Sequence, residues 1–547
     1  MKNRALLQMG CLLLAICSTC ASSLAQASGN LPTTTYTNLL NFDYSNGGNP
    51  AYESLVEGLD GNFYGTTSYE SYNPPGNGTV FKITPSGTLT TLHTFDFSDG
   101  SQPEAGLVLA RNGNFYGTTY AGGTFSAGTV FEITPSGTLT TLHSFDYATD
   151  GSDPYAAVIQ ATDGNIYGTA PFQGPGGDGT VFKINPSSGM FTVLYSFGTN
   201  GGATPYGGLV QGSNGDLYGT TYTGTVNTAY GTVFKITTSG VYTLLHTFVN
   251  SDGARPWSSL VQGTDGYLYG TTTGGGSSYE GTVFKMTASG TLTTLHNFAV
   301  TDGSYPTAGL IQATDGNFYG TTQFGGTYGY GTIFKITSSG TFTSLYSFPD
   351  TSGDEPYGGL LQATDGDFYG TTYKGGPENV GTVFSLSVGL KPFLELLPAY
   401  GKEGATITIL GNGLSGATGI SFDGTPASAY TIVSNSEILV SVPAGAQTGK
   451  VKVTTPGGTI SSSASFKVTP TISSFRPPSG PVGQLVVITG TGFLQTSKVT
   501  FNGTVATFAT PTDTQISATV PTGATTGKIA ITTKGGTVKT ATKFTVN

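Results

Sequence analysis

The sequence predicts an all-β protein, a seven-bladed β-propeller followed by two immunoglobulin-like β-sandwiches. Three observations support this fold class. A unit of about fifty residues occurs seven times, each unit has the pattern of four short strands, and two similar Gly/Pro-punctuated segments follow the last unit. A regular repeat of this length is typical of a propeller or a solenoid rather than of separate domains.

Two phrases carry the repeat. The first is Asn62–Thr67, whose tyrosine returns at spacings of 52, 51, 51, 51, 50 and 50 residues. The second is Gly78–Ile83, whose phenylalanine returns once in every unit. A proline also returns in every unit, at Pro50, Pro103, Pro154, Pro205, Pro256, Pro306 and Pro356.

The third unit shows the expected strands. Residues 157–161, 165–169, 180–184 and 191–197 are rich in β-branched and aromatic residues, and turn-forming residues separate them. The Asp-Gly pair of 162–164 favours a tight turn between the first two strands. Four antiparallel strands in one unit make a propeller blade.

The ends of the repeat region predict a closed ring over residues 33–389. Residues 35–42 resemble the fourth strand of a unit, whereas the seventh unit ends at 382–386 without one. We therefore expect the N-terminal strand to complete the last blade, which leaves no open sheet edge. This reasoning gives seven blades rather than eight.

Connection lengths distinguish two faces of the ring. The connections between the first and second strands, and between the third and fourth, are short and nearly identical in all units. The remaining connections are longer and differ from unit to unit. Because variable loops on a rigid scaffold commonly carry binding, we expect any ligand on the loop-rich face.

The tail contains two similar segments, 390–467 and 468–547. Gly411–Leu414 in the first corresponds to Gly490–Phe493 in the second, and both contain a Thr-Gly-Lys turn. Short alternating strands between Gly/Pro turns fit an immunoglobulin-like sandwich.

These phrases resemble two known families. Residues 392–547 are similar to the IPT/TIG family of immunoglobulin-like domains, and residues 33–387 resemble the bacterial choice-of-anchor tandem-repeat proteins, whose unit is the GloVer repeat. The second resemblance implies an exported, often surface-held protein. Neither implies a catalytic residue or a cofactor.

The first 27 residues have the features of a signal peptide. Lys2 and Arg4 precede the apolar run Leu12–Ile16, and Ala25–Ala27 is a small-x-small cleavage site. We expect a secreted protein, extracellular or at the cell surface, with the periplasm as an alternative. All three cysteines precede residue 28, so neither disulfides nor thiolate metal sites are expected.

Charge and hydropathy restrict the partners. The chain has a net charge of −10, which argues against nucleic acid or anionic membrane as the main partner. No later stretch approaches twenty apolar residues, so no transmembrane segment is expected after signal removal. We expect a monomer.

Repeated polar positions have structural interpretations. The four histidines share one position of the fourth strand with Tyr and Leu, which indicates packing rather than a metal site. No metal or cofactor is predicted. A Gln series in the first strand, beginning with Glu57 and broken by Leu109, indicates hydrogen bonds between neighbouring units, with a polar channel lining as the alternative.

One position at the entrance to the first strand is the best binding candidate. In each unit this position lies three residues before the first apolar residue of the first strand. From the first unit to the seventh, it is occupied by Tyr52, Glu104, Tyr155, Tyr206, Trp257, Thr307 and Tyr357. We call this the slot position. Five of its seven residues are aromatic, as suits stacking on a sugar or gripping a peptide. The predicted ligand-binding residues are Tyr52, Glu104, Tyr155, Tyr206, Trp257 and Tyr357, with aromatic packing at the mouth as the alternative.

Within this set, Trp257, Tyr206 and Tyr155 come from consecutive units, so they are expected to form one continuous platform.

The predicted function is non-enzymatic binding or adhesion, with an extracellular glycan or protein as the ligand. No nucleophile elbow or zinc-protease motif occurs, so no catalytic residue is assigned. Two alternatives remain. One is a carbohydrate-active hydrolase or lyase that uses mouth carboxylates such as Glu53, Glu104, Asp153 and Glu355. The other is a structural protein of the cell envelope or matrix.

Overall fold

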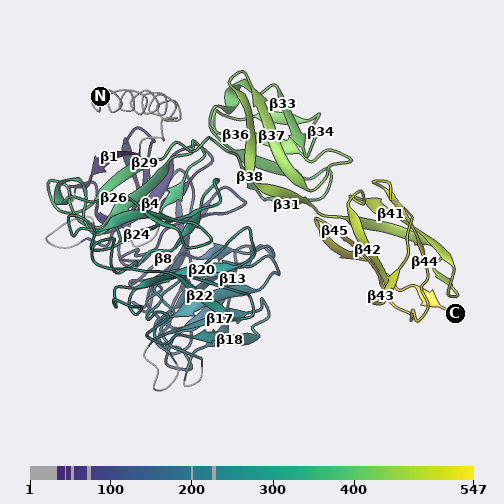
Figure 1. Ribbon diagram of the computed structural model, residues 1–547, viewed down its shortest axis with the longest axis horizontal. Helices are drawn as coiled ribbons and strands as arrows, with labels where there is room; N and C mark the ends of the chain where they lie inside the picture. Colours follow the sequence, from purple (N-terminus) through teal and green to yellow (C-terminus); the bar gives the residue numbers. More distant parts are fainter. Residues whose placement is uncertain are drawn as a thin grey trace, which may run out of the picture.

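A computed structural model describes residues 34–43, 45–50, 54–69, 76–198, 201–224, 230–509 and 511–547 (Figure 1). The predicted signal peptide of residues 1–27 and the candidate Tyr52 lie outside these residues. The described part is all-β and contains no α-helix, only the 3₁₀ turns η1 (Asp350–Ser352) and η2 (Leu414–Gly416). The all-β prediction is therefore confirmed, and the repeat region is propeller-like.

The third unit forms one antiparallel sheet of four strands in the order β11-β12-β13-β14. These strands are β11 (Ile159–Gln160), β12 (Ile166–Ala170), β13 (Thr180–Asn185) and β14 (Met190–Ser196). The first strand is shorter than its apolar run predicts, and the other three agree to within about one residue. We refer to these as the first to fourth strands of a unit.

The other units repeat this sheet, and the first unit adds a fifth strand, β2, beside β4. Their strands are β2 (Gly48–Pro50), β3 (Val56–Glu57), β4 (Phe63–Tyr69), β5 (Thr79–Ile83) and β6 (Leu89–Thr94); β7 (Val108–Leu109), β8 (Phe115–Thr119), β9 (Thr129–Ile133) and β10 (Leu139–Ser144); β15 (Val210–Gln211), β16 (Leu217–Thr221), β17 (Thr232–Ile236) and β18 (Tyr242–Thr247); β19 (Val261–Gln262), β20 (Leu268–Thr272), β21 (Thr282–Met286) and β22 (Leu292–Asn297); β23 (Ile311–Gln312), β24 (Phe318–Thr322), β25 (Thr332–Ile336) and β26 (Phe342–Ser347); and β27 (Leu361–Gln362), β28 (Phe368–Thr372) and β29 (Thr382–Ser387).

The N-terminal strand joins the last sheet. β1 (Thr35–Asn41) pairs antiparallel with β29, and Thr35 lies opposite Ser387. The ring of Tyr36 stacks on Tyr346 of the sixth unit, with 4.2 Å between ring centroids. The predicted pairing of residues 35–42 with the seventh unit is confirmed, and it places the two ends of the repeat region side by side.

A glycine in the second strand makes room for the repeated phenylalanine of the third. Phe182 is fully buried, and a Cβ atom placed on Gly168 would lie 2.5 Å from the Cζ atom of this ring. Any larger residue at 168 would push the ring out of the core. The paired phrases of the repeat therefore encode one packing contact within each sheet, and the buried rings fill the space between neighbouring sheets.

The Asp-Gly turns hold the repeated tyrosine. The hydroxyl of Tyr167 donates to Asp163 at 2.7 Å, and the same pair forms in four other units, at Tyr64–Asp60, Tyr269–Asp265, Tyr319–Asp315 and Tyr369–Asp365. Asn112 and Asn214 contact the tyrosine hydroxyl in the remaining two units. A buried phenol thus finds a partner on its own turn.

Glutamines connect neighbouring sheets, as the sequence predicts. In each case the side-chain oxygen accepts the backbone N–H of a turn in the preceding unit. The bonds are Arg111 to Gln160 (3.0 Å), Thr162 to Gln211 (2.8 Å), Ser213 to Gln262 (2.7 Å), Thr264 to Gln312 (2.9 Å) and Thr314 to Gln362 (2.9 Å).

Glu57 takes the place of glutamine where the first unit meets the seventh. Its carboxylate accepts both the backbone N–H and the hydroxyl of Thr364, at 2.8 and 2.7 Å. Burial, with smaller contributions from the neighbouring Glu395 and Asp365, raises the pKa of Glu57 to about 7 against the lowering effect of the Thr364 hydrogen bonds. The joint between the first and seventh units therefore carries an ionisable side chain where five other joints carry glutamine.

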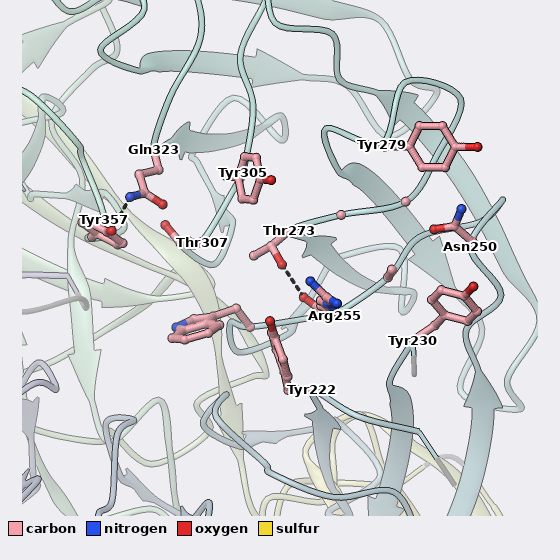
Figure 2. A pocket seen from close by; sticks show the side chains of 14 residues that line it. Tyr222, Tyr230, Asn250, Arg255, Thr273, Tyr279, Tyr305, Thr307, Gln323 and Tyr357 are labelled. Atoms are coloured by element: carbon pink, nitrogen blue, oxygen red, sulfur yellow. Dashed lines mark hydrogen bonds between the residues drawn. The ribbon is translucent and has the colours of Figure 1, made fainter. Parts of the chain in front are cut away.

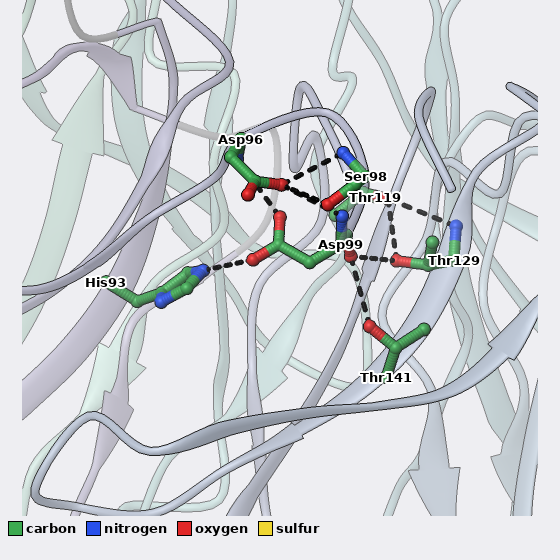
Figure 3. A network of polar contacts seen from close by, with 7 residues as sticks. All are labelled: His93, Asp96, Ser98, Asp99, Thr119, Thr129 and Thr141. Carbon is green, nitrogen blue, oxygen red and sulfur yellow. Dashed lines mark hydrogen bonds and ion pairs between the residues drawn. The ribbon is translucent and has the colours of Figure 1, made fainter. Parts of the chain in front are cut away.

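Each histidine pairs with an aspartate of its own unit. His93 Nε2 lies 2.7 Å from Asp99 Oδ2, within a network that reaches Thr129 and Thr141 of the next unit (Figure 3). Equivalent pairs join His143 to Asp150, His246 to Asp252 and His296 to Asp302. Burial lowers the pKa of His143 and of His296. The histidine position thus carries a polar contact in addition to the predicted packing.

The C-terminal part contains two modules, each with its own apolar core. The first has two main sheets, built from β30 (Glu395–Leu397), β32 (Thr406–Leu410), β36 (Glu437–Ser441) and β35 (Tyr430–Ile432), and from β31 (Tyr400–Gly401), β38 (Gly458–Val468), β37 (Gly449–Thr455), β33 (Gly419–Phe422) and β34 (Thr425–Pro426). The second contains β39 (Thr471–Arg476), β41 (Leu485–Thr491) and β44 (Gln515–Thr519); β40 (Ser479–Gly480) and β47 (Thr545–Val546); and β43 (Thr504–Ala506), β42 (Thr496–Phe501), β45 (Ile529–Thr533) and β46 (Gly536–Lys539).

The first module contacts the short turns of the repeat region. The hydroxyl of Tyr400 donates to the carbonyl of Thr162 at 2.9 Å, and that of Ser436 donates to Leu59 at 2.7 Å. Both acceptors lie between the first and second strands of their units. The second module extends away from the ring (Figure 1). The face that carries these turns, here the turn face, is therefore partly covered, and the opposite face, the loop face, carries the long loops.

Candidate ligand-binding site

The site is built from a backbone feature that occurs in all seven units on the loop face. The residue before each repeated proline has a positive φ angle, a conformation that residues other than glycine seldom adopt. The values are 52° at Asn49, 53° at Gln102, 56° at Asp153, 58° at Thr204, 58° at Arg255, 52° at Tyr305 and 52° at Glu355. We call these the pre-proline residues. Their backbone geometry is nearly identical, whereas all seven side chains differ.

Hydrogen bonds on both sides hold this backbone in place. In the fifth unit the N–H of Arg255 donates to the carbonyl of Tyr230 at 2.8 Å, and the carbonyl of Arg255 accepts the N–H of Thr273 at 3.2 Å. The first bond reaches the preceding unit and the second stays within the fifth. The side chain of a pre-proline residue therefore leaves a fixed backbone position.

From the second to the seventh unit, the slot residue follows the proline and is anchored by the preceding unit. In six units a threonine hydroxyl of the Gly-Thr-Thr or Gly-Thr-Ala phrase donates to the carbonyl of the residue after the slot of the next unit. These bonds are Thr66 to Ala105 (2.8 Å), Thr118 to Ala156 (3.2 Å), Thr169 to Gly207 (3.1 Å), Thr220 to Ser258 (3.2 Å), Thr271 to Ala308 (3.1 Å) and Thr321 to Gly358 (3.1 Å).

The slot aromatics contact one another, but they do not form a flat platform. Tyr206 and Trp257 stack face to face, 4.3 Å apart and 11° from parallel. Tyr155 and Tyr222 meet Trp257 edge-on, at 86° and 88°. The predicted continuous platform is thus replaced by a packed cluster, because adjacent slot residues are close enough to stack on each other.

A cavity of about 420 Å³ opens beside this cluster (Figure 2). Its wall includes Trp257 and Tyr357 from the slot position, and Thr307 stands in the slot between them. Threonine there leaves the space that an aromatic ring occupies in most other units. The other lining residues are Tyr222, Tyr230, Asn250, Ala254, Arg255, Thr273, Gly274, Gly275, Tyr279, Tyr305 and Gln323.

The polar side chains that line the cavity differ in whether they have a hydrogen-bond partner. Gln323 donates a hydrogen bond to the hydroxyl of Tyr357. The hydroxyl of Thr307, a residue that is only 8% exposed, has no hydrogen-bond partner among the described residues. Figure 2 shows Thr307 between Tyr357, Gln323 and Tyr305. A buried hydroxyl without a partner is a donor and acceptor available to whatever occupies the cavity.

Arg255 is the one charged residue among the described residues that line the cavity. Its side chain is exposed, and the guanidinium carbon lies 5.8 Å from the ring centroid of Tyr222. No aspartate or glutamate of the described residues forms an ion pair with it. Figure 2 places it between Tyr222 and Thr273.

Of the predicted carboxylates at the mouth, Glu53 lies outside the described residues, and Glu104, Asp153 and Glu355 are not among the residues that line the cavity. Glu104 accepts a hydrogen bond from Ser68 at 2.9 Å, and burial raises its pKa to about 7. Burial also raises the pKa of Asp153. Glu355 forms an ion pair with Lys374 at 2.8 Å. Near neutral pH, Glu104 is thus partly protonated, and Glu355 already has a counter-ion.

The outcome for the predicted site residues is mixed. Tyr155, Tyr206 and Trp257 come together, and Trp257 and Tyr357 line the cavity. Glu104 does not. Sequence analysis missed the pre-proline Arg255 and the loop residues Tyr222 and Gln323. A signal for Arg255 was present, because the position before an invariant proline changes in every unit.

Two further features of the described residues bear on function. They hold no group of three or more His, Cys, Asp or Glu side chains arranged to bind a metal ion. No helix in the described ranges is long and apolar enough to cross a membrane.

Two family models match the chain. The model of the Gloeobacter/Verrucomicrobia repeat matches residues 54–262 and 212–433, and the model of the IPT/TIG domain matches residues 470–546. No curated protein matches.

Several solved structures are similar at low identity. A fungal alcohol oxidase of the AA5 family in complex with copper shares 15% identity, with 80% of this chain and 100% of that chain covered and a TM-score of 0.44. A gluconolactonase from Xanthomonas campestris shares 11%, with 53% and 87% covered and a TM-score of 0.34. A surface glycan-binding protein from Prevotella bryantii shares 21%, with 27% and 38% covered and a TM-score of 0.21. Similarities of this size carry no argument about function.

Proposed function

This chain belongs to the Gloeobacter/Verrucomicrobia repeat family, and we propose that it is an extracellular protein that binds a glycan in the loop-face cavity. In this proposal residues 1–27 are a signal peptide and residues 33–389 form a closed seven-bladed propeller. Residues 390–467 and 468–547 are immunoglobulin-like sandwiches that serve as spacers or adhesion modules. The protein acts as a monomer.

The observation that carries this proposal is the composition of the cavity wall. Aromatic rings from Tyr222, Trp257 and Tyr357 stand beside amide and hydroxyl groups from Asn250, Gln323 and other residues. Sugars combine C–H faces, which stack on aromatic rings, with hydroxyl groups, which need donors and acceptors. A mainly apolar pocket with a few directed polar groups fits such a ligand.

Binding is favoured over glycan cleavage by the position of the carboxylates. A hydrolase needs two carboxyl groups that flank the scissile bond. None of the described residues that line the cavity is an aspartate or glutamate. Glu355, close to the wall, is neutralised by Lys374.

The position of the first C-terminal module supports access from the loop face. Its contacts through Tyr400 and Ser436 lie on the turn face. A ligand on the loop face therefore does not compete with the module, and the module can hold the ring at a distance from a surface.

The decisive experiment places an aromatic ring at residue 307, where the slot position carries threonine. The purified protein is screened on a glycan array, and the affinity of each hit is measured by calorimetry. We expect Thr307→Tyr to abolish binding and Trp257→Ala to weaken it about tenfold, the equivalent of one lost stacking contact. Melting temperatures of both variants should stay within a few degrees of the parent.

A matched control places the same substitution elsewhere. Thr90→Tyr adds a ring to an exposed position of β6 and should leave binding unchanged. The proposal is wrong if the array yields no glycan, or if Thr307→Tyr binds as well as the parent. Release of reducing or unsaturated ends from a bound glycan would instead support the enzymatic alternative.

A further inference from the structure

The residues that line the cavity also indicate the charge of its ligand. This further inference rests on the proposed function. We infer that the bound glycan is acidic and that Arg255 binds the carboxylate of a uronic acid residue. Trp257 and Tyr222, which lie beside Arg255 in the wall, would contact the sugar ring.

Charge complementarity is the first argument. The whole chain has a net charge of −10, yet the only charged side chain among the described lining residues is an arginine. A neutral ligand would need no such group. A carboxylate, in contrast, would gain a charge-assisted and potentially bidentate contact from the guanidinium group.

The lack of an internal partner for Arg255 is the second argument. Glu355, another pre-proline residue, has Lys374 at 2.8 Å. Asp153, a third, accepts a hydrogen bond from Ser152 at 3.1 Å. Among the described residues, the Arg255 side chain contacts the ring of Tyr222, 5.8 Å from its guanidinium carbon, and forms no ion pair. Its guanidinium group therefore donates no side-chain hydrogen bond to the described residues and is available to a ligand in the cavity that it lines.

The backbone of Arg255 is the third argument. A φ angle of 58° costs an L-residue free energy that glycine would avoid. The other pre-proline residues show that the position accepts Asn, Gln, Asp, Thr, Tyr or Glu. All of them share its φ angle, so the fold does not require arginine there, and the choice of side chain at this place in the cavity wall is free to serve a ligand.

The chemistry of a uronic acid matches this arrangement. Its pyranose ring presents a C–H face to an aromatic ring, while the carboxylate projects from the ring edge. Arg255 and Trp257 are separated by a single proline, whose fixed φ angle holds the two side chains in a constant relation. One residue can therefore stack on the sugar while the other meets its acid group.

The test uses uronic acid oligosaccharides and their neutral derivatives. An array of galacturonate, glucuronate, mannuronate and guluronate oligomers is compared with the methyl esters of the same oligomers. We expect the acid form of the best ligand to bind about ten- to hundredfold more tightly than its ester. Binding of the acid form should also weaken as ionic strength rises.

Substitution of Arg255 completes a double-mutant cycle. Arg255→Gln should weaken binding of the acid by the same factor as esterification, and it should leave binding of the ester unchanged. Arg255→Lys should retain part of the preference, since it keeps the charge but loses the fork. Arg476→Gln removes an exposed arginine from the second module and is the matched control.

The outcomes separate this inference from the proposed function. Glycan binding that depends on Thr307 and Trp257 but is equal for acid and ester would overturn the inference and leave the proposed function intact. Failure of every glycan, acidic or neutral, would overturn both. Binding of acidic peptides alone, through Arg255, would overturn the assignment to a glycan.

Discussion

The turn face and the loop face of the same ring differ in which features recur from unit to unit. On the turn face the same side chains recur, and each contacts the same partner in its own or the neighbouring unit, as Gln262 contacts Ser213 and Tyr269 contacts Asp265. On the loop face the backbone recurs, but the side chains at the pre-proline and slot positions change. Repetition of side chains is therefore typical of the scaffold, and repetition of the backbone alone is typical of the candidate site.

The physical reason lies in where each side chain finds its partner. A buried phenol or a turn N–H must be satisfied inside the protein, so every unit needs the same solution. The side chain of a pre-proline residue such as Arg255 extends from a backbone whose own hydrogen bonds are already made. It can change without cost to the fold, and the units have diverged there.

The largest expected effect breaks the scaffold. Phe284 is fully buried between sheets, and Phe284→Ala should lower the free energy of unfolding by about 3–5 kcal/mol. Chemical denaturation measures this. Tyr279→Ala, in the long loop of the same unit, removes an exposed ring and should change stability by less than about 0.5 kcal/mol. Equal effects at both positions would contradict the contrast between the two faces.

A smaller effect is expected at the joint between the first and seventh units on the turn face. Burial raises the pKa of Glu57 from 4.5 to about 7, so the folded state binds a proton that the unfolded state has released between these pH values. The contribution of Glu57 to the free energy of unfolding is fully present below pH 4.5 and is lost as the pH rises toward 7. Glu57→Gln should therefore stabilise the protein at pH 8 by on the order of 1–3 kcal/mol, with little change at pH 4.

The reverse substitution provides the control for this prediction. Gln362 occupies the same position in the seventh unit and is also buried. Gln362→Glu should introduce the pH dependence that Glu57→Gln removes. Thermal unfolding of both variants across pH measures the effect, and parallel stability profiles for parent and Glu57→Gln would refute the assignment.

The smallest expected effect sharpens the account of the loop face. Thr204 is a β-branched residue with a φ angle of 58°. Thr204→Gly should stabilise the protein by about 0.5–1 kcal/mol, because relief of the left-handed conformation exceeds the entropic cost of glycine. The same change at Thr243, exposed on β18, should destabilise by about 0.5–1 kcal/mol. Destabilisation at both positions would mean that the pre-proline backbone carries little strain.

The sequence by itself determined the scaffold. Recurring phrases such as Asn62–Thr67 located the strands, and the displaced fourth strand at residues 35–42 predicted the pairing that β1 makes with β29. The Gln series predicted the bonds between units. These features can be recognised in the sequence because each depends on a short-range pattern that recurs along the repeat region.

Only the tertiary structure decided the geometry of the candidate site. The stacking of Tyr206 on Trp257 and the edge-on contact of Tyr155 with Tyr206 depend on distances between units, which no single unit encodes. The cavity is bordered by Thr307, which is smaller than most of its counterparts, and Arg255 from the neighbouring unit lines the same cavity. These are contacts between residues about fifty positions apart in different units. A repeat makes the backbone of such positions predictable, but which side chains meet there depends on the packing of the units against each other.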